Sequence, residues 1–249
     1  MPHLGYHPNP CSVDRFFGVP VFPSPLSPEV NAAAPPSATA NLSQNELAYD
    51  MLKDRLTTLV YKPGEYLNTA SLMADLALGR TPLNHALHRL ATEGLVQIIP
   101  RKGVMVAPLS IDDALDMIDV RLVNEALCAR LASQRITAAE IKVLRATAKS
   151  FDKAVAERNV AQMMQFDRLF HEQIADASRN PVLIEVLRVL HARSQRFWAI
   201  SLSKSGHVVE VRDEHQKIVD ALESGNADAA EQAFNHHVLS FRQALLSGR

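Results

Sequence analysis

Two ionisable side chains lie four positions apart in the segment 165–181, whose sequence is QFDRLFHEQIADASRNP. Asp167 and His171 stand at positions i and i+4, which share one face of an α-helix with Cβ atoms about 5–6 Å apart. Apolar residues flank them at helical spacing, namely Phe166, Leu169, Phe170 and Ile174. Such a pair could form a surface hydrogen bond, half of a metal site or an acid–base couple.

Two later histidines extend this candidate site. A single helical histidine is usually a structural residue, but His215 and His237 fall on later predicted helices, and a bundle can collect ligands from facing helices. One carboxylate and three imidazoles suit Zn²⁺, or Ni²⁺, Fe²⁺ and Mn²⁺ when water fills further positions. We therefore predict a divalent-metal site, with Zn²⁺ as the first expectation, formed by Asp167, His171, His215 and His237. The neighbouring His236 is turned about 100° around the helix and is expected to point elsewhere.

The composition is that of an ordinary globular protein, with 249 residues, 47% hydrophobic and 21% charged. This length suits one large domain or two smaller ones. The formal net charge of −1 excludes a global basic field, so any nucleic-acid binding must come from a local patch. The two cysteines are too few for a disulfide framework and favour the cytoplasm. No apolar run approaches the roughly 18 residues of a membrane span.

Residues 1–40 differ from the rest of the chain. They hold nine of the 14 prolines and only three charged residues. A segment of this kind lacks the patterned apolar content needed for folding. We expect a disordered arm, or a start site placed too far upstream.

Residues 41–108 predict three short helices followed by a β-hairpin. The first helix is expected over about residues 44–59, and Asn68 or Thr69 can cap the second. Thr81, followed by Pro82, predicts the start of the third helix. Two β-rich runs, LVQIIP and GVMVAP, then lie on either side of Arg101 and Lys102. This order is typical of a winged helix-turn-helix, whose third helix enters the major groove of DNA.

The predicted third helix has one apolar face and one polar face. Leu83, Ala86, Leu87 and Leu90 are expected to pack inward. The opposite face presents Asn84 and His85, while Arg101 and Lys102 at the hairpin tip suit phosphate contacts. Residues 41–109 contain seven basic and six acidic side chains, so the charge alone also allows a small domain that binds protein.

Residues 109–249 predict an antiparallel bundle of about six helices. Ser110 is expected to begin the first helix, and the sequence TAAE at 137–140 forms a capping box. Breaks fall at Asn180-Pro181 and at Gly225-Asn226, the latter turning a helical hairpin. The predicted fold class is therefore mainly α, with an N-terminal winged helix-turn-helix and a C-terminal helical domain.

The segment 48–108 resembles the DNA-binding domain of the GntR family of bacterial regulators. It contains the elements KPGEYL, RTPLNHALHRL, EGLV and KGVMV in the family's order. The resemblance implies DNA-contacting or wing-forming roles for Arg80, Thr81, Arg89 and Gly103. The family often has arginine and glutamate where this chain has Asn84 and His85, and asparagine suits adenine rather than guanine.

The helical half resembles the FCD effector domain of the FadR-type branch, through FDRLFHEQIADASRNPVL and EHQKIVDALESGNADAAEQAFNHHV. The family's ligand pattern falls on the predicted metal ligands named above. The segment DVRLVNEALCARLA resembles the first effector-domain helix and implies that Arg121 reaches the effector pocket. An intrahelical pair with Glu125 is the alternative for Arg121. Arg196 is a further pocket candidate, with a solvated surface arginine as its alternative.

Together these resemblances imply a cytoplasmic, homodimeric transcription regulator that binds a double-stranded DNA operator. A small organic acid would complete the metal's coordination sphere and contact Arg121. Its binding would shift the two DNA-binding domains of the dimer from one relative geometry to another. Repression relieved by effector is the commoner family behaviour, and activation stays open. Two alternatives are a metal-dependent hydrolase at the Asp/His site and an effector-binding protein with weakened DNA binding.

Overall fold

The computed structural model describes residues 43–202 and 205–247. Helices dominate these ranges, and their β-structure is a single small antiparallel sheet. The predicted fold class is therefore confirmed: a winged helix-turn-helix followed by a helical domain. The arm predicted over residues 1–40 lies outside the described residues.

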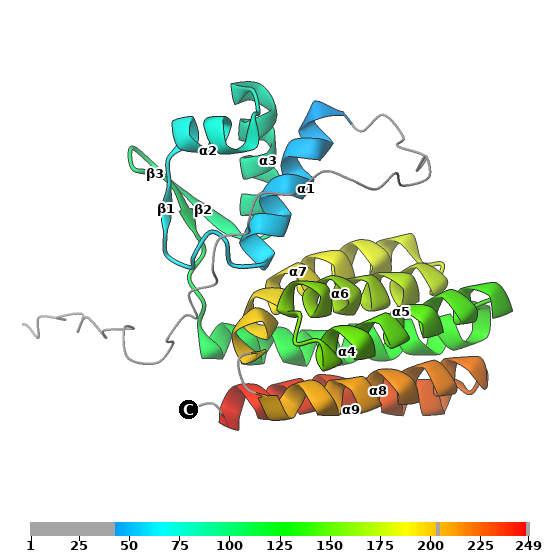
Figure 1. Cartoon of the computed structure of the whole chain (residues 1–249). Coiled ribbons are helices and arrows are strands. Elements are labelled where there is room, and N and C mark those ends of the chain that lie inside the picture. The colour runs from blue at the N-terminus through cyan, green and yellow to red at the C-terminus, as the bar shows by residue number, and fades with distance from the viewer. Residues whose placement is uncertain (1–42, 203–204, 248–249) are drawn as a thin grey trace, which may run out of the picture.

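The N-terminal part combines three helices with the sheet, and the third helix packs on the other two and on the sheet (Figure 1). Its elements are α1 (Gln44–Thr57), β1 (Tyr66–Leu67), α2 (Thr69–Leu76), α3 (Arg80–Thr92), β2 (Val96–Ile99) and β3 (Gly103–Val106). The strand order is β1-β3-β2, with both pairs antiparallel. The predicted hairpin is thus present, but β1 was not predicted, because a two-residue strand carries no periodic signal.

Local capping chemistry explains where these helices start. Ser43 and Glu46 form a capping box at α1, and the Asn68 side chain accepts the first backbone N–H groups of α2. The prediction that Thr81 caps α3, with Pro82 as the first helical residue, is wrong, because the helix begins two residues earlier, at Arg80. Gly79 takes the N-cap position with extended backbone and provides no side-chain hydrogen bond.

The hairpin loop depends on one glycine. Ile99 pairs with Gly103 at the end of the ladder, and the Lys102 N–H donates to the Ile99 carbonyl at 3.0 Å. Gly103 has φ +103°, a backbone conformation that residues with a Cβ rarely adopt. The loop therefore holds Arg101 and Lys102 at the tip of a turn whose shape requires glycine.

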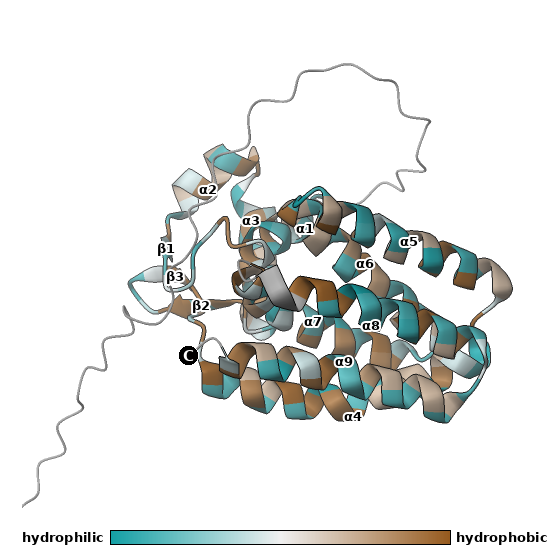
Figure 2. Ribbon diagram, turned by 60° about the horizontal axis from the view of Figure 1, so that its bottom comes forward, coloured by the Kyte–Doolittle hydropathy of each residue, from teal (hydrophilic) through white to brown (hydrophobic). Residues whose placement is uncertain are grey.

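The C-terminal part is the predicted antiparallel helical domain. Its helices are α4 (Ile111–Arg135), α5 (Ala138–Ala156), α6 (Val160–Ala177), α7 (Pro181–Ser201), α8 (Ser205–Glu223) and α9 (Ala227–Ser247). Ser110 caps α4 and Thr137 forms the predicted capping box with Glu140. Asn180 caps α7, with Pro181 in the first turn. Figure 2 shows apolar and polar residues alternating along these helices, as expected for amphipathic elements.

Two hydrophobic cores form, one in each part of the chain. Leu52, Leu83 and Leu90 are fully buried in the first core, and Phe151, Phe170 and Phe234 in the second. Full burial of one such side chain contributes roughly 1.5–3 kcal/mol. Between the two parts, α1 packs on α7 (Figure 1). None of the helices in the described ranges is both long and apolar enough to cross a membrane.

Candidate functional site

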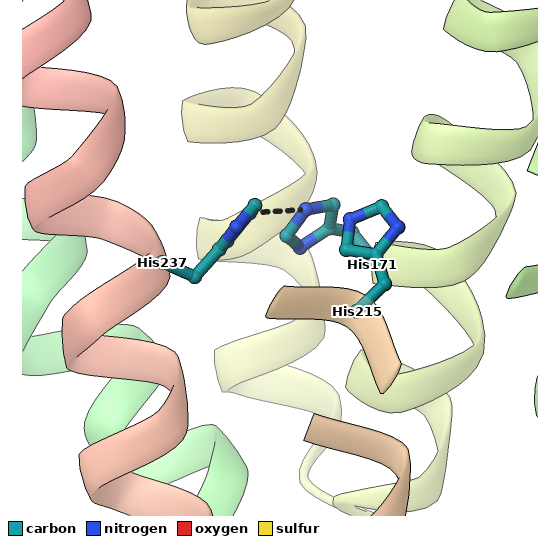
Figure 3. Close-up of side chains that lie close together, drawn as sticks. All are labelled: His171, His215 and His237. Atoms are coloured by element: carbon teal, nitrogen blue, oxygen red, sulfur yellow. Dashed lines mark hydrogen bonds between the residues drawn. The ribbon is translucent and has the colours of Figure 1, made fainter. Parts of the chain in front are cut away.

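Three histidines from three helices meet inside the helical domain (Figure 3). His171 of α6, His215 of α8 and His237 of α9 each place a ring nitrogen within 4.8 Å of the others. All three are buried, and the Nε2 atoms of His171 and His237 are 3.2 Å apart. The Asp167 Oδ1 atom lies 3.4 Å from His215 Nε2 and 4.0 Å from His171 Nε2. All four predicted ligands are therefore neighbours.

Two buried carboxylates face the far sides of these imidazole rings. The His237 Nδ1 donates to Glu214 Oε2 at 2.8 Å, which leaves Nε2 turned toward His171. On the other side, His171 Nδ1 lies 3.7 Å from Glu125 Oε2. Metal-binding histidines usually donate their second ring nitrogen to such a carboxylate, which orients the ring and fixes its tautomer.

The buried environment keeps His171 and His215 in the neutral form that binds metal. Burial lowers the pKa of His171 well below its usual range and also lowers the pKa of His215. Burial alone would raise the pKa of Asp167, but its contact with the His215 ring lowers it to about 2. Near neutral pH the site thus combines the ionised carboxylate of Asp167 with the neutral imidazoles of His171 and His215, and metal coordination requires these forms.

Unpaired nitrogen atoms provide an independent test of the fit to a metal. Within the described residues, both ring nitrogens of His215 are buried without a hydrogen-bond partner. A buried polar group without a partner costs free energy, and a bound cation would offset that cost at the nitrogens that face it. The oxygen and nitrogen donors present suit a divalent metal such as Zn²⁺.

A second group, Glu125, His171 and His191, also has the spacing of a metal site. Glu125 is already paired, because Oε1 accepts from Arg121 Nε at 2.5 Å and lies 3.3 Å from His191 Nε2. Burial alone would raise the pKa of Glu125, but the Arg121 charge holds it well below its usual range. A guanidinium beside the carboxylate disfavours another cation there. Glu125 is therefore better suited to orienting His171.

Of the residues near the predicted metal ligands, His236 was assigned correctly from the sequence, whereas two others were not predicted. His236 is 67% exposed in its side chain and is not part of the histidine group, as expected, although its Nδ1 lies 3.6 Å from Glu214 Oε1. The roles of Glu214 and His191 were not predicted. Glu214 directly precedes His215, but its contact with His237 joins two helices, so no local spacing signals it.

A cavity of about 740 Å³ opens beside the histidines. Its walls come from the helical domain and from helices α1 and α3 of the N-terminal domain. The helical domain contributes Arg121, Asp167, Arg168, His171, Glu172, Arg188, His191, Ala192, Ser194, Gln195, Trp198, Val211, His237 and Phe241. The N-terminal domain contributes Glu46, Tyr49, Asp50, Met51, Lys53, Asp54, Thr57 and Arg89. A molecule in this cavity could touch both domains.

Arg121 was predicted either to reach the effector pocket or to pair with Glu125, and each prediction describes part of its environment. Its Nε donates to Glu125, the intrahelical pair expected at i+4, and its Nη1 donates to Ser194 Oγ at 2.6 Å. The same side chain also lines the cavity. Guanidinium carries five N–H donors, so these two bonds leave donors for a carboxylate ligand.

The prediction that Arg196 lines this pocket needs correction. Arg196 lines a smaller cavity on another face of α7, and its Nη2 donates to the Ala107 carbonyl. It is only 2% exposed, so the alternative of a solvated surface arginine is also wrong. Helical spacing could not reveal this, because the contact depends on how the two domains pack together.

Five residues form a polar network between the domains, which we call the interdomain cluster: Tyr49, Lys53, Arg89, Glu93 and Arg188. The Glu93 carboxylate accepts from the Tyr49 hydroxyl at 2.8 Å and from Arg188 Nη2 at 2.9 Å. Arg188 also donates to Tyr49. Four of the five cluster residues line the cavity, so the network forms one wall of the candidate pocket.

The predicted DNA-reading surface is exposed. On α3, Arg80, Thr81, Asn84 and His85 lie outward, opposite the buried leucines, and Arg101, Lys102 and Gly103 are exposed at the hairpin tip. Arg89 differs: its guanidinium lies 3.6 Å from the centre of the Tyr49 ring, and its Nε is 3.4 Å from Glu93. Arg89 therefore belongs to the interdomain cluster, although its side chain is 47% exposed.

This combination of winged helix-turn-helix and helical domain defines the class of DNA-binding transcriptional regulators. Residues 44–106 match the family model described as bacterial regulatory proteins, gntR family, and residues 116–240 match the FCD domain. The chain thus belongs to the GntR family and carries an FCD domain.

Individual relatives agree with this assignment. The Nta operon transcriptional regulator of Aminobacter aminovorans is 35% identical over 133 residues, which cover 53% of this chain and 63% of that protein. The transcriptional repressor RspR of Escherichia coli is 22% identical over 201 residues, covering 81% and 88%. The solved structure of E. coli McbR/YncC superposes with a TM-score of 0.77 at 20% identity, covering 83% and 98%, which supports the fold.

Proposed function

We propose that this protein is a repressor whose helical domain binds a divalent metal and a small organic acid, and that the acid changes operator affinity. The observation that carries the proposal is the buried group of three histidines and Asp167 beside a cavity shared by both domains. The kinship to a named repressor supports the direction of regulation.

Asp167, His171, His215 and His237 would hold the metal. A bound divalent ion would supply a Lewis-acidic position for a carboxylate oxygen, and Zn²⁺ best suits the donor set. Glu125 and Glu214 would keep the rings of His171 and His237 oriented. Arg121, held by Glu125 and Ser194, would meet the carboxylate of the acid.

The cavity offers a route from effector to DNA. Tyr49, Lys53 and Arg89 belong to the DNA-binding domain, yet they line the same cavity as His171 and His237. An acid bound beside the histidines would change the electrostatic environment of the interdomain cluster, which lines the same cavity. A change in domain orientation would then alter operator affinity, with coupling of typically 1–3 kcal/mol.

A homodimer fits the geometry of operators. Winged helix-turn-helix dimers read two half-sites about one helical turn apart. Three exposed apolar residues, Val120, Val123 and Leu127, follow one another at i, i+3 and i+7 on α4. This stripe suits contact with a second copy of the chain. Operator binding would take place in the cytoplasm.

The test is a metal and effector assay on the purified protein. Metal content is measured first, followed by thermal unfolding with a panel of organic acids, because ligands of the native state raise its stability. An acid that stabilises the metal-loaded protein should also change its affinity for the DNA upstream of its own gene. Sequence-selective binding that never responds to any acid would contradict the effector role. A metal-dependent hydrolase would instead turn over its substrate and lose turnover in His215→Asn.

A further inference from the structure

A second cavity, of about 280 Å³, lies where the two domains join. Its lining includes Gly94 and Val96 from the N-terminal domain, the connecting residues 107–109, and the arginines Arg193 and Arg196 of α7. The side chains that line the effector pocket from α7, such as His191 and Ser194, are not part of it. The two cavities are therefore distinct.

Arg196 is a buried cation without a matching anion. It is 2% exposed and forms no ion pair with any carboxylate of the described residues. Its Nη2 donates to the Ala107 carbonyl, but Nε is buried and has no hydrogen-bond partner within that part of the chain. A buried charge is stable only when it is paired or fully hydrogen-bonded, so this guanidinium lacks a counter-ion.

The surroundings of Arg196 further favour the binding of an anion. Burial and the nearby guanidinium of Arg193 lower the pKa of Arg196 to about 10. Arg193 is half-buried and likewise forms no ion pair within the described ranges. The acidic residue on the cavity wall, Asp113, is exposed in the first turn of α4 and pairs with neither arginine. Two arginines thus line one small cavity, and within the described residues neither forms an ion pair with a carboxylate.

We propose that this cavity is a binding site for a small oxyanion, a phosphate or a carboxylate, held by Arg193 and Arg196. The planar guanidinium fork matches both kinds of oxyanion and can donate two parallel hydrogen bonds. The unpaired Nε of Arg196 is one donor available to it. An anion here contacts both domains and the residues that connect them, so it holds the DNA-binding domain in one orientation.

Isothermal titration calorimetry with inorganic phosphate and, separately, acetate tests the proposal at matched ionic strength. The wild-type chain should bind at least one of the two anions with one site per chain. Arg193→Ala removes a half-buried side chain and should weaken binding about tenfold or more, since a hydrogen bond to a charged group is lost. Arg196→Gln should abolish binding, and the exposed Lys142→Ala should bind as the wild type does.

The outcomes separate this site from the effector pocket. His215→Asn, which alters only the candidate metal centre, should leave anion binding unchanged. Saturable binding that is lost in His215→Asn but kept in Arg193→Ala would assign the anion to the effector pocket and overturn this proposal. Absence of saturable binding of either anion to the folded wild type would overturn it as well, without bearing on the metal centre.

Discussion

Glu93, at the C-terminal end of α3, and Arg188, on α7, form an ion pair of 2.9 Å that joins the DNA-binding domain to the helical domain. Glu93 is buried and also accepts from Tyr49, so the pair lies at the centre of the interdomain cluster. A fixed contact between the end of α3 and the helical domain is a physical means by which one domain can influence the other.

Arg188→Met should destabilise the protein by about 1–3 kcal/mol, because it leaves a buried carboxylate with weaker partners. Urea unfolding followed by circular dichroism measures the loss. The control is Arg168→Met, whose 3.5 Å pair with Asp54 also joins the domains but is more exposed. That variant should lose less than about 1 kcal/mol. Equal losses in the two variants would show that burial of Glu93 has no special role.

Metal binding should depend on His215 and not on His236. His215→Asn removes a buried ring of the candidate centre, whereas His236→Asn changes an exposed neighbour of His237. Elemental analysis of protein purified without chelator should find about one metal per chain in the wild type and in His236→Asn. Much less metal is expected in His215→Asn. Equal metal content in all three proteins would place any bound metal elsewhere.

Glu214→Gln should weaken metal binding by roughly 10–100-fold without removing a ligand, because the carboxylate that orients the His237 ring is replaced by an amide. Competition with a chromogenic chelator gives the affinity. Circular dichroism is the check that the helical fold persists. An unchanged affinity in the folded variant would rule out an orienting role for Glu214.

Acidification should destabilise the metal-free protein. The folded state keeps His171 and His215 neutral, since burial lowers both pKa values, whereas in the unfolded chain they take up protons near pH 6.5. Stability is therefore lost as the pH falls through about 6.5, where the unfolded chain binds protons that the two buried rings of the folded state exclude. Urea titrations with a chelator present measure this loss. His215→Gln should lose less stability and His236→Gln as much as the wild type; identical losses in both would contradict the assignment.

The predicted DNA-reading surface divides into residues that we expect to contact DNA and Arg89, whose guanidinium packs on Tyr49 and Glu93 of its own domain. Lys102→Ala should lower the salt dependence of operator binding by about one ion, and Asn84→Ala should relax base preference at one position by about 1–3 kcal/mol. Arg89→Ala should leave the salt dependence nearly unchanged, because this side chain lies on Tyr49 and Glu93. If Arg89→Ala lowers the salt dependence of operator affinity as much as Lys102→Ala does, Arg89 contacts DNA and this assignment is wrong.

Periodicity and capping signals predicted most of the fold. Leu83, Leu87 and Leu90 marked the buried face of α3, and Ser110 and Thr137 marked helix starts in the bundle. Such signals act over one or two helical turns, which is why they work from sequence alone. They failed at Gly79, where backbone conformation without a side-chain cap decided the helix start, and at the two-residue strand β1.

The candidate site was predictable only in part. Asp167 and His171 share one helix, so their spacing showed that they are neighbours. The meeting of His215 and His237 with them was inferred from a bundle and from family resemblance, because the contacts join helices distant in sequence. Contacts such as that of Arg196 with Ala107 arise from domain packing and leave no periodic pattern.

Fluorescence anisotropy of the DNA upstream of the protein's own gene tests the central claim most directly. The metal-loaded wild type and His215→Asn are titrated with this DNA, with and without the organic acid that most stabilises the wild type. The acid should change wild-type affinity by about 5–150-fold and leave the affinity of His215→Asn unchanged. The same acid-dependent change in both proteins, or no sequence-selective binding by the wild type, would contradict the claim.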